Sequence, residues 1–251
     1  MSVFSDSYSK YYNLLYRDKD YNGEANYVDQ CIQRFNPRAA TVMDIGCGTG
    51  KHASLLAHSG YQVLGIDRSE AMLAVAQKSE IPGHLRFLPG DLRTLHLPES
   101  FDAVISLFHV MCYLNKNEDL QLAFQNVSNH LHKGGVFIFD CWYGPAVLTE
   151  RPSVRLKELK DEEVTVTRIT QPIIYANENV VDVRYHMFIK DLRNNTVEEI
   201  KESHRMRYLF TPEVNGMLKN AGIQLEECFE FMTENPPGLE TWNVCYVGRK
   251  L

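Results

Sequence analysis

The strongest constraint in this chain is a short apolar run that passes directly into a turn with three glycines. Residues 42–51 read Val-Met-Asp-Ile-Gly-Cys-Gly-Thr-Gly-Lys, so the acidic Asp44 precedes glycines at 46, 48 and 50. This pattern is typical of a strand that continues through a tight turn into a helix. Because glycine has no side chain, the turn can approach a ligand closely, and the following helix points its free N–H groups at it. The segment therefore predicts a ligand site, although similar turns also serve only to reverse a chain.

Composition and net charge limit the classes of ligand that this site could bind. The chain has 251 residues, of which 44% are apolar and 23% charged, which fits one sizeable domain or a core domain with an insertion. The formal net charge of -6, without a run of Lys or Arg, argues against nucleic acid and favours a small molecule. No apolar stretch reaches the ~18 residues of a membrane span, and residues 1–6 lack the layout of a signal peptide. We therefore expect a cytoplasmic protein with no membrane partner.

Cysteine and histidine spacing gives no sign of a metal site. The six cysteines are scattered, and none forms a Cys-x-x-Cys pair. His130 and His132 are the only closely spaced histidines, and no cysteine or carboxylate set accompanies them at ligand spacing. We therefore expect neither a disulfide framework nor a bound metal.

Beyond the glycine turn, predicted strands and helices alternate along the chain. Strands that alternate with helices form parallel sheets with right-handed crossovers, so the chain predicts an α/β fold with a doubly wound sheet. Ligands of such sheets bind beyond the carboxyl ends of the strands, where Asp44, Asp67, Asp91 and Ser106 fall. The predicted elements after the turn are helices 51–59, 69–79 and 117–131 and strands 61–67, 84–88, 101–107 and 136–140.

The chain before the first strand is rich in tyrosine. We expect residues 1–39 to form a helical cover over a ligand, with two short helices on either side of a turn at residues 20–23. The alternative is that the aromatic rings only cap the core. The tyrosines of this segment are Tyr8, Tyr11, Tyr12, Tyr16, Tyr21 and Tyr27.

The second half of the chain changes from helical spacing to alternation. Residues 163–210 alternate with period two between turn signals, which predicts an antiparallel three-stranded β-sheet inserted into the fold. We expect this insertion to act as a lid, a dimer surface, or both. A final helix from Thr211 and strands 223–232 and 242–249 then return to the first sheet. The predicted domains are the N-terminal cover 1–39, a core of 40–150 with 211–251, and the insertion 151–210.

The spacing of glycines and acids separates two classes of nucleotide site. A dinucleotide fingerprint needs its third glycine where this chain has Lys51. Asp67, at the end of the second strand, is placed to accept hydrogen bonds from both hydroxyls of a ribose. Asp91, after the third strand, is placed to accept from the amine of an adenine. The set predicts an adenosine pocket without a pyrophosphate.

These motifs together resemble those of the class I S-adenosylmethionine-dependent methyltransferases. The resemblance covers roughly residues 40–140 and 205–250. It implies a Rossmann-like, seven-stranded sheet that is mostly parallel with its last strand antiparallel, and S-adenosyl-L-methionine as the cofactor. The motifs are Asp44 to Gly50, Asp67 with Ser69 and Met72, Gly90-Asp91, and Leu131 to Gly135.

The resemblance also implies a role for each cofactor-site residue. The glycine turn would hold the methionine part, Asp67 the ribose and Asp91 the adenine amine. Leu92 and Met72 would pack against the adenine, and Leu107 would flank the sulfonium. The implied cofactor-binding residues are Tyr12, Tyr21, Asp44, Gly46, Cys47, Gly48, Asp67, Arg68, Met72, Asp91, Leu92 and Leu107.

A narrower resemblance links both ends of the chain to bacterial N-methyltransferases of nucleotide-linked 3-amino-deoxysugars. It implies that Tyr12 and Tyr21 close over the cofactor. This chain departs from that subgroup in two places: Tyr113 stands where a histidine lies near the sugar amine, and residues 237–241 replace a glycine- and arginine-rich segment that meets the phosphates. The residues that carry the resemblance are 12–16, 19–21, 24–25, 50–52, 202–205 and 209–211.

Methyl transfer to an amine needs a neutral lone pair, so a nearby side chain has to take the ammonium proton. The candidate catalytic residues are Tyr113, His109, His204 and Glu202, each of which could instead be structural. Residues 235–238, Asn-Pro-Pro-Gly, lie between the last two strands and have glycine where adenine methylases of nucleic acids have an aromatic residue, so we interpret them as a turn.

The leading hypothesis is therefore a methyltransferase, monomeric or homodimeric, that acts on the amine of a nucleotide-linked amino sugar. The alternatives are an O-methyltransferase of another small metabolite and a non-catalytic S-adenosylmethionine-binding protein.

Overall fold

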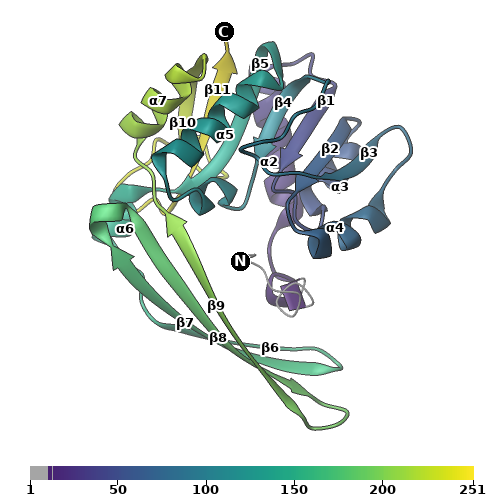
Figure 1. Cartoon of the computed structure of the whole chain (residues 1–251), viewed down its shortest axis with the longest axis vertical. Coiled ribbons are helices and arrows are strands. Elements are labelled where there is room, and N and C mark those ends of the chain that lie inside the picture. Colours follow the sequence, from purple (N-terminus) through teal and green to yellow (C-terminus); the bar gives the residue numbers. More distant parts are fainter. Residues whose placement is uncertain (1–10, 13) are drawn as a thin grey trace.

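The computed structural model describes residues 11, 12 and 14–251 and contains two β-sheets (Figure 1). The larger sheet has seven strands in the order β10-β11-β5-β4-β1-β2-β3. Neighbouring strands are parallel except where β11 takes part, because β11 is antiparallel to both β5 and β10. This confirms the predicted doubly wound sheet with its last strand reversed. The strands are β1 (Thr41–Ile45), β2 (Gln62–Asp67), β3 (Leu85–Pro89), β4 (Phe101–Ser106), β5 (Leu131–Trp142), β10 (Ile223–Glu230) and β11 (Asn243–Lys250).

Helices cover both faces of this sheet, which explains why its central strands carry apolar side chains on both faces. In β4 and β5, Val104 and Phe137 face a core that includes Phe124 of α5, whereas Ile105 and Ile138 face a core that includes Ile32 of α2. A strand buried on both faces has no polar side to show, as expected for a parallel sheet. The helices are α2 (Tyr21–Phe35), α3 (Lys51–His58), α4 (Glu70–Ala76), α5 (Asn117–Asn129), α6 (Gly144–Thr149) and α7 (Thr211–Asn220), with 3-10 turns η1 (Gln77–Ser79), η2 (Val110–Tyr113) and η3 (Ala176–Glu178).

The start of the chain differs from the expectation. Residues 20–23 are not a turn between two helices, because Asp20 caps α2 and its Oδ1 accepts a hydrogen bond from the Gly23 N–H at 2.9 Å. An aspartate followed by a glycine within three residues is compatible with either a turn or a helix start, and here the helix cap prevails. Residues 1–10 and 13 of the predicted N-terminal cover, with Tyr8, lie outside the described residues.

The second sheet is the predicted insertion, but it has four antiparallel strands rather than three. Its order is β6-β7-β8-β9, and β6 reads Arg-Leu-Lys-Glu-Leu-Lys, in which only Leu159 is buried. An edge strand with one buried side chain has little apolar alternation, so the sequence pattern did not reveal it. The strands are β6 (Arg155–Lys160), β7 (Val164–Tyr175), β8 (Val180–Asp191) and β9 (Val197–Arg207).

The insertion extends away from the core, and the first described residues lie between the two (Figure 1). Tyr11 and Leu15 pack with Val166, Met187 and Ile200 on one face of the insertion. The N-terminal segment therefore belongs structurally to the insertion as well as to the core. This arrangement leaves space for a site bounded by all three parts.

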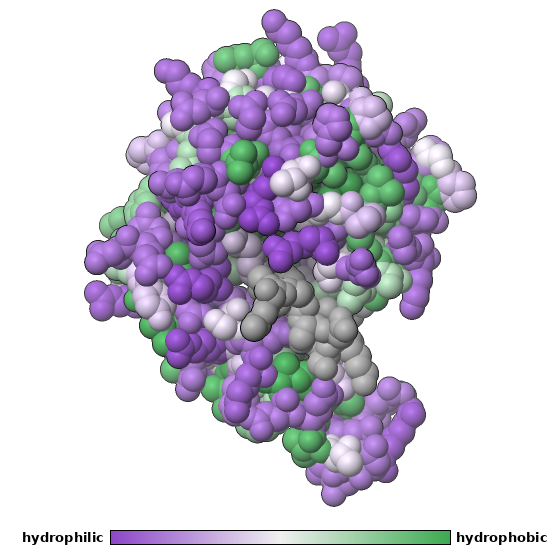
Figure 2. All heavy atoms as spheres, in the orientation of Figure 1, coloured by the Kyte–Doolittle hydropathy of each residue, from purple (hydrophilic) through white to green (hydrophobic). Residues whose placement is uncertain are grey.

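The outer surface is mainly hydrophilic in the orientation of Figure 1, with apolar residues in small separate groups (Figure 2). Within the part of the chain that the structure describes, no helix is both long enough and apolar enough to cross a bilayer.

The three glycines of the turn after β1 all have left-handed backbones, with φ of 76° at Gly46, 56° at Gly48 and 77° at Gly50. A side chain at Gly46 would place its Cβ 2.5 Å from Val110, and one at Gly50 would lie 2.6 Å from Phe87. A Cβ at Gly48 would meet no atom within 4 Å. The turn thus needs glycine for conformation at all three positions and for space at two of them.

We predict that Gly46→Ala lowers the free energy of unfolding by about 2–5 kcal/mol, because a left-handed alanine costs ~1–2 kcal/mol and overpacking costs a further ~1–3 kcal/mol. Gly48→Ala has only the conformational cost of ~1–2 kcal/mol. Urea unfolding of the two variants beside wild type measures the difference. Equal destabilisation by both would contradict the steric argument.

Candidate active site

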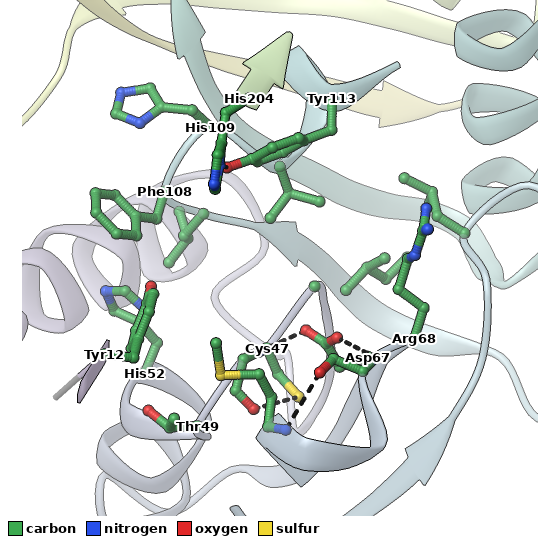
Figure 3. Close-up of a pocket in the computed structure, with 18 of the residues that line it drawn as sticks. Tyr12, Cys47, Thr49, His52, Asp67, Arg68, Phe108, His109, Tyr113 and His204 are labelled. Carbon is green, nitrogen blue, oxygen red and sulfur yellow. Dashed lines mark hydrogen bonds between the residues drawn. The ribbon is translucent and has the colours of Figure 1, made fainter. Parts of the chain in front are cut away.

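A cavity of about 390 Å³ opens at the carboxyl ends of β1, β2 and β4. Figure 3 shows that Asp67 and Cys47 lie at one end of it and that Tyr113 and His204 lie at the other. We call the first end the cofactor half and the second the acceptor half. The cofactor half comes from the core, and the acceptor half also has walls from β7, β8 and β9 of the insertion.

Asp67 anchors the cofactor half. Its Oδ2 accepts a hydrogen bond from the Gly48 N–H at 2.8 Å, and its Oδ1 accepts one from the Ser69 N–H at 2.8 Å. Burial raises the pKa of this carboxyl group above its usual value. Each carboxylate oxygen keeps a second lone pair. Asp67 therefore ties the glycine turn to the end of β2 and can still accept from two neighbouring hydroxyl groups.

Asp91 is held by an arginine that the sequence analysis did not single out. Arg93 donates from Nε to Oδ1 at 2.9 Å and from Nη2 to Oδ2 at 2.6 Å, and these bonds lower the pKa of Asp91 to about 2. The Arg93 N–H also donates to Oδ1 at 2.9 Å. Oδ1 is thus fully used, and Oδ2 is the oxygen with capacity for a ligand amine. Leu92 and Met72 line the same end of the cavity and are nearly fully buried.

Asp44 lies outside the cavity lining, although the sequence analysis placed it among the cofactor residues. Its side chain is 1% exposed, and Oδ2 has no hydrogen-bond partner among the described residues. Burial raises the pKa of Asp44 to about 6. Asp44 precedes Ile45 and Gly46, which do line the cavity, so its carboxyl group lies behind the lining and not in it.

The turn after β4 brings the next residues into the cavity. Phe108 and His109 are both in the left-handed region, with φ of 66° and 64°, and the His109 N–H donates to Asp140 Oδ1 at 2.9 Å. Left-handed bulky residues are uncommon and concentrate at functional sites. Burial lowers the pKa of His109, whose Nε2 is 3.6 Å from Asp140 Oδ2. The turn thus presents Leu107, Phe108 and a neutral imidazole to the cavity.

Three of the four predicted catalytic residues form a hydrogen-bonded chain at the acceptor half. Tyr113 Oη lies 2.9 Å from His204 Nδ1, and His204 Nε2 lies 3.0 Å from Glu202 Oε2. Tyr113 comes from η2 and the other two from β9, where residues two apart share a face. Burial raises the pKa of Tyr113 well above its ordinary value, so its phenol stays protonated. In the tautomer that carries its proton on Nε2, His204 donates to the Glu202 carboxylate and accepts at Nδ1 from the phenol.

The cavity gathers almost all the residues that the sequence analysis selected. Of the predicted site residues, only Asp44 and Glu202 do not line it, and Glu202 lies behind His204. Tyr12 and Tyr21 both line the cavity, and burial raises the pKa of Tyr21 to about 12. The described residues contain no group of three or more histidine, cysteine or acidic side chains that could hold a metal.

Several cavity residues were missed. Arg168, Tyr185 and Met206 lie on the cavity side of the insertion strands, in the same alternation that pointed to His204. That alternation was the available signal, but it does not say which of the two faces meets the core. The other lining residues not selected are Tyr16, Ile45, Thr49, Lys51, His52, Ser69, Gly90, Arg93, Phe108, Val110, Leu114, Asp119 and Trp142.

Comparisons with known proteins agree with this geometry. Residues 42–135 match the model of a methyltransferase domain. The chain is 26% identical over 226 residues to dTDP-3-amino-3,4,6-trideoxy-alpha-D-glucopyranose N,N-dimethyltransferase of Streptomyces venezuelae, which covers 89% of this chain and 93% of that protein. It is 29% identical over 237 residues to dTDP-3-amino-3,6-dideoxy-alpha-D-glucopyranose N,N-dimethyltransferase of Streptomyces fradiae, covering 94% and 89% respectively.

A solved structure shows the same likeness over the whole chain. The structure of S-adenosylmethionine-bound CalS10, an amino pentose methyltransferase from Micromonospora echinaspora, has a TM-score of 0.78 and 26% identity. The match covers 99% of this chain and 98% of that one, so it includes the insertion as well as the core.

The cofactor half fits S-adenosylmethionine on its own chemistry. Asp67 supplies acceptors for a ribose diol, and Asp91 Oδ2 supplies one for the adenine amine. The buried, unpartnered oxygen of Asp44 adds negative charge behind the turn that would receive the methionine ammonium. The sulfonium and ammonium of this cofactor are cations, which suits a half lined by carboxylates.

We predict that Asp67→Ala weakens S-adenosylmethionine binding by about 1.5–3 kcal/mol, or roughly 10- to 150-fold, because hydrogen bonds to a charged acceptor are lost. Calorimetric titration measures the change, with exposed Asp18→Ala as a control for loss of one acid. Unchanged affinity in Asp67→Ala would refute the ribose assignment.

Proposed function

Because this chain is an S-adenosylmethionine-dependent methyltransferase with a class I, Rossmann-like core, we propose that it methylates the amine of a nucleotide-linked amino sugar. The observation that carries the proposal is the chain Tyr113–His204–Glu202 in the acceptor half. Both curated relatives act on such amines by name, and each match extends through the insertion that builds this half.

An amine acceptor arrives as an ammonium ion at neutral pH and must lose one proton before it can attack. The Tyr113 oxygen accepts this proton while its own proton passes to His204 Nδ1. The resulting imidazolium is stabilised by the Glu202 carboxylate at 3.0 Å, so the positive charge forms next to a negative one. The amine is left neutral, and the Tyr113 phenol is restored.

The cofactor supplies a methyl group that is activated by its sulfonium, so the protein has mainly to align the amine and exclude water. The turn of Leu107 and Phe108 borders the cavity between its two halves, and Tyr12 and Tyr16 close it from the N-terminal side. We assign His109 to this wall as well, because it lines the cavity beside Phe108 and burial, which disfavours its imidazolium, lowers its pKa despite the nearby Asp140.

The two alternative functions differ from this proposal in the group that is methylated or in whether any methyl group is transferred. An O-methyltransferase would use a hydroxyl in the same half, and a binding protein would keep the cofactor half without reaction. The monomeric or homodimeric state, the absence of a nucleic-acid partner and the cytoplasmic location remain predictions.

We predict release of S-adenosylhomocysteine with dTDP-linked 3-amino or 4-amino deoxysugars, and a product heavier by one or two methyl groups. Matched sugars with a hydroxyl in place of the amine are the control and should not react. Reaction of only the hydroxyl sugars would support O-methylation. Cofactor binding without any reaction across the panel would support the non-catalytic alternative.

A second prediction concerns the proton acceptor. His204→Gln and Tyr113→Phe should each lower kcat/KM about 10²- to 10⁴-fold without changing cofactor affinity, because proton removal is lost. Since a base works only when unprotonated, wild-type activity should rise with pH, and the variants should recover part of their loss at high pH, where the amine loses its proton unaided. His186→Gln, on the opposite face of the insertion from Tyr185, is the matched control. An unaltered pH profile in His204→Gln would exclude the relay.

A further inference from the structure

Within the described part of the chain, Arg168 of β7 brings a positive charge with unpaired N–H donors to the acceptor half. The residue lines the cavity, and its Nε and Nη1 atoms are buried without a hydrogen-bond partner among the described residues. A buried guanidinium is costly unless its donors are satisfied, and buried polar groups nearly always are. The mechanism proposed above does not use this side chain.

Aromatic rings hold the guanidinium in place. Its carbon lies 5.0 Å from the ring centroid of Tyr185 and 6.0 Å from that of Tyr16. Cation–π contacts of this kind stabilise the charge but do not satisfy N–H donors, which point outward in the guanidinium plane. The rings therefore fix the position of Arg168 and leave its donors for another partner.

The other cations at the cavity differ from Arg168. Arg93 is bound to Asp91 and Asp119, and Arg68 and Lys51 are exposed residues. The acids that line the cavity all come from the core: Asp67 ends β2, Asp91 follows β3 and Asp119 lies in α5. No lining residue from the insertion is acidic, and Glu202 behind them is hydrogen-bonded to His204.

The neighbouring loop does not supply a cation either. Residues 231–242 between β10 and β11 read Phe-Met-Thr-Glu-Asn-Pro-Pro-Gly-Leu-Glu-Thr-Trp, with no lysine or arginine. Its last residue, Trp242, contacts the cavity residue Trp142 at a ring separation of 5.8 Å. Among the residues that the structure describes, the cavity arginine with buried, unpartnered donors therefore lies on the insertion and not on this loop.

We propose that Arg168 binds a negatively charged group, phosphate or carboxylate, of the methyl acceptor. The planar guanidinium matches both oxyanions with two parallel N–H bonds. Because Arg168 and the Tyr113–His204 pair line the same half of the cavity, an anion on Arg168 would orient the acceptor so that its amine faces Tyr113. The inference rests on the proposed function only in taking this half as the acceptor side.

The test measures anion binding to the protein saturated with S-adenosylhomocysteine. The probes are thymidine diphosphate, inorganic pyrophosphate, glucuronate and uncharged thymidine, titrated by calorimetry. Arg168→Gln should weaken binding of the anions about 10-fold or more, since hydrogen bonds to a charged group are lost, and should leave thymidine and S-adenosylhomocysteine unaffected. Arg155→Gln, which removes an exposed arginine of the same sheet, should behave as wild type.

The probes separate the two sources of charge. Pyrophosphate and thymidine diphosphate binding that depends on Arg168 identifies a phosphate group, and glucuronate binding that depends on it identifies a carboxylate. Arg168→Lys keeps the charge but loses the paired donors, so its affinity should lie between wild type and Arg168→Gln. Equal anion affinity in wild type and Arg168→Gln, or no binding of any anion to wild type, would overturn the proposal.

The two proposals can fail separately. If anions bind through Arg168 but no sugar nucleotide is methylated, the amino-sugar function fails and the anion site stands. If amino-sugar nucleotides are methylated and Arg168→Gln leaves KM unchanged, the function stands and the anion site fails. Thermal unfolding of Arg168→Gln and Arg168→Lys beside wild type shows that both variants are folded.

Discussion

The hydrogen bond between the Gly48 N–H and the Asp67 carboxylate links the two parts on which the cofactor half depends. It joins the glycine turn after β1 to the end of β2, which are parallel neighbours in the sheet. Three left-handed glycines bring the backbone close enough for this contact, and Asp67 also accepts from Ser69 at the start of α4. One carboxylate therefore positions a turn, a strand end and a helix start, and it does so at the edge where parallel strands present ligands.

The acceptor half has a different origin. It forms where the insertion folds back toward the core, so its residues come from η2, β7, β8 and β9 and from the N-terminal segment. The packing of Tyr11 and Leu15 on Val166, Met187 and Ile200 connects the segment to the insertion. This packing brings Tyr12 and Tyr16 over the cavity. The apolar contact between the N-terminal segment and the insertion therefore positions the cavity wall that a substrate would meet. Differences in acceptor among such proteins can arise there without any change to the cofactor half.

The two halves of the cavity also differ in the charges of the side chains that line them. Asp67 and Asp91 line the cofactor half, where Arg93 is paired with Asp91, whereas the acceptor half has Arg168, with two buried donors unpartnered in the described chain, and a histidine backed by Glu202. A cationic cofactor and an anionic acceptor would each meet the opposite charge, and the transferred methyl group passes between them.

The sequence by itself determined the sheet, its winding and most of the cofactor half. Glycine spacing, acids at strand ends and apolar strands are local signals, and each follows from backbone geometry or burial within a few residues. The sequence could not place Arg168 at the cavity or join Tyr113 to His204. The 2.9 Å Tyr113–His204 contact links residues 91 positions apart, and Arg168 reaches Tyr16 from the other end of the chain. It also missed β6 and misplaced a turn at 20–23, where weak local patterns suit more than one structure. Only the tertiary structure decided which face of the insertion meets the core, since alternation defines two faces but packing chooses between them.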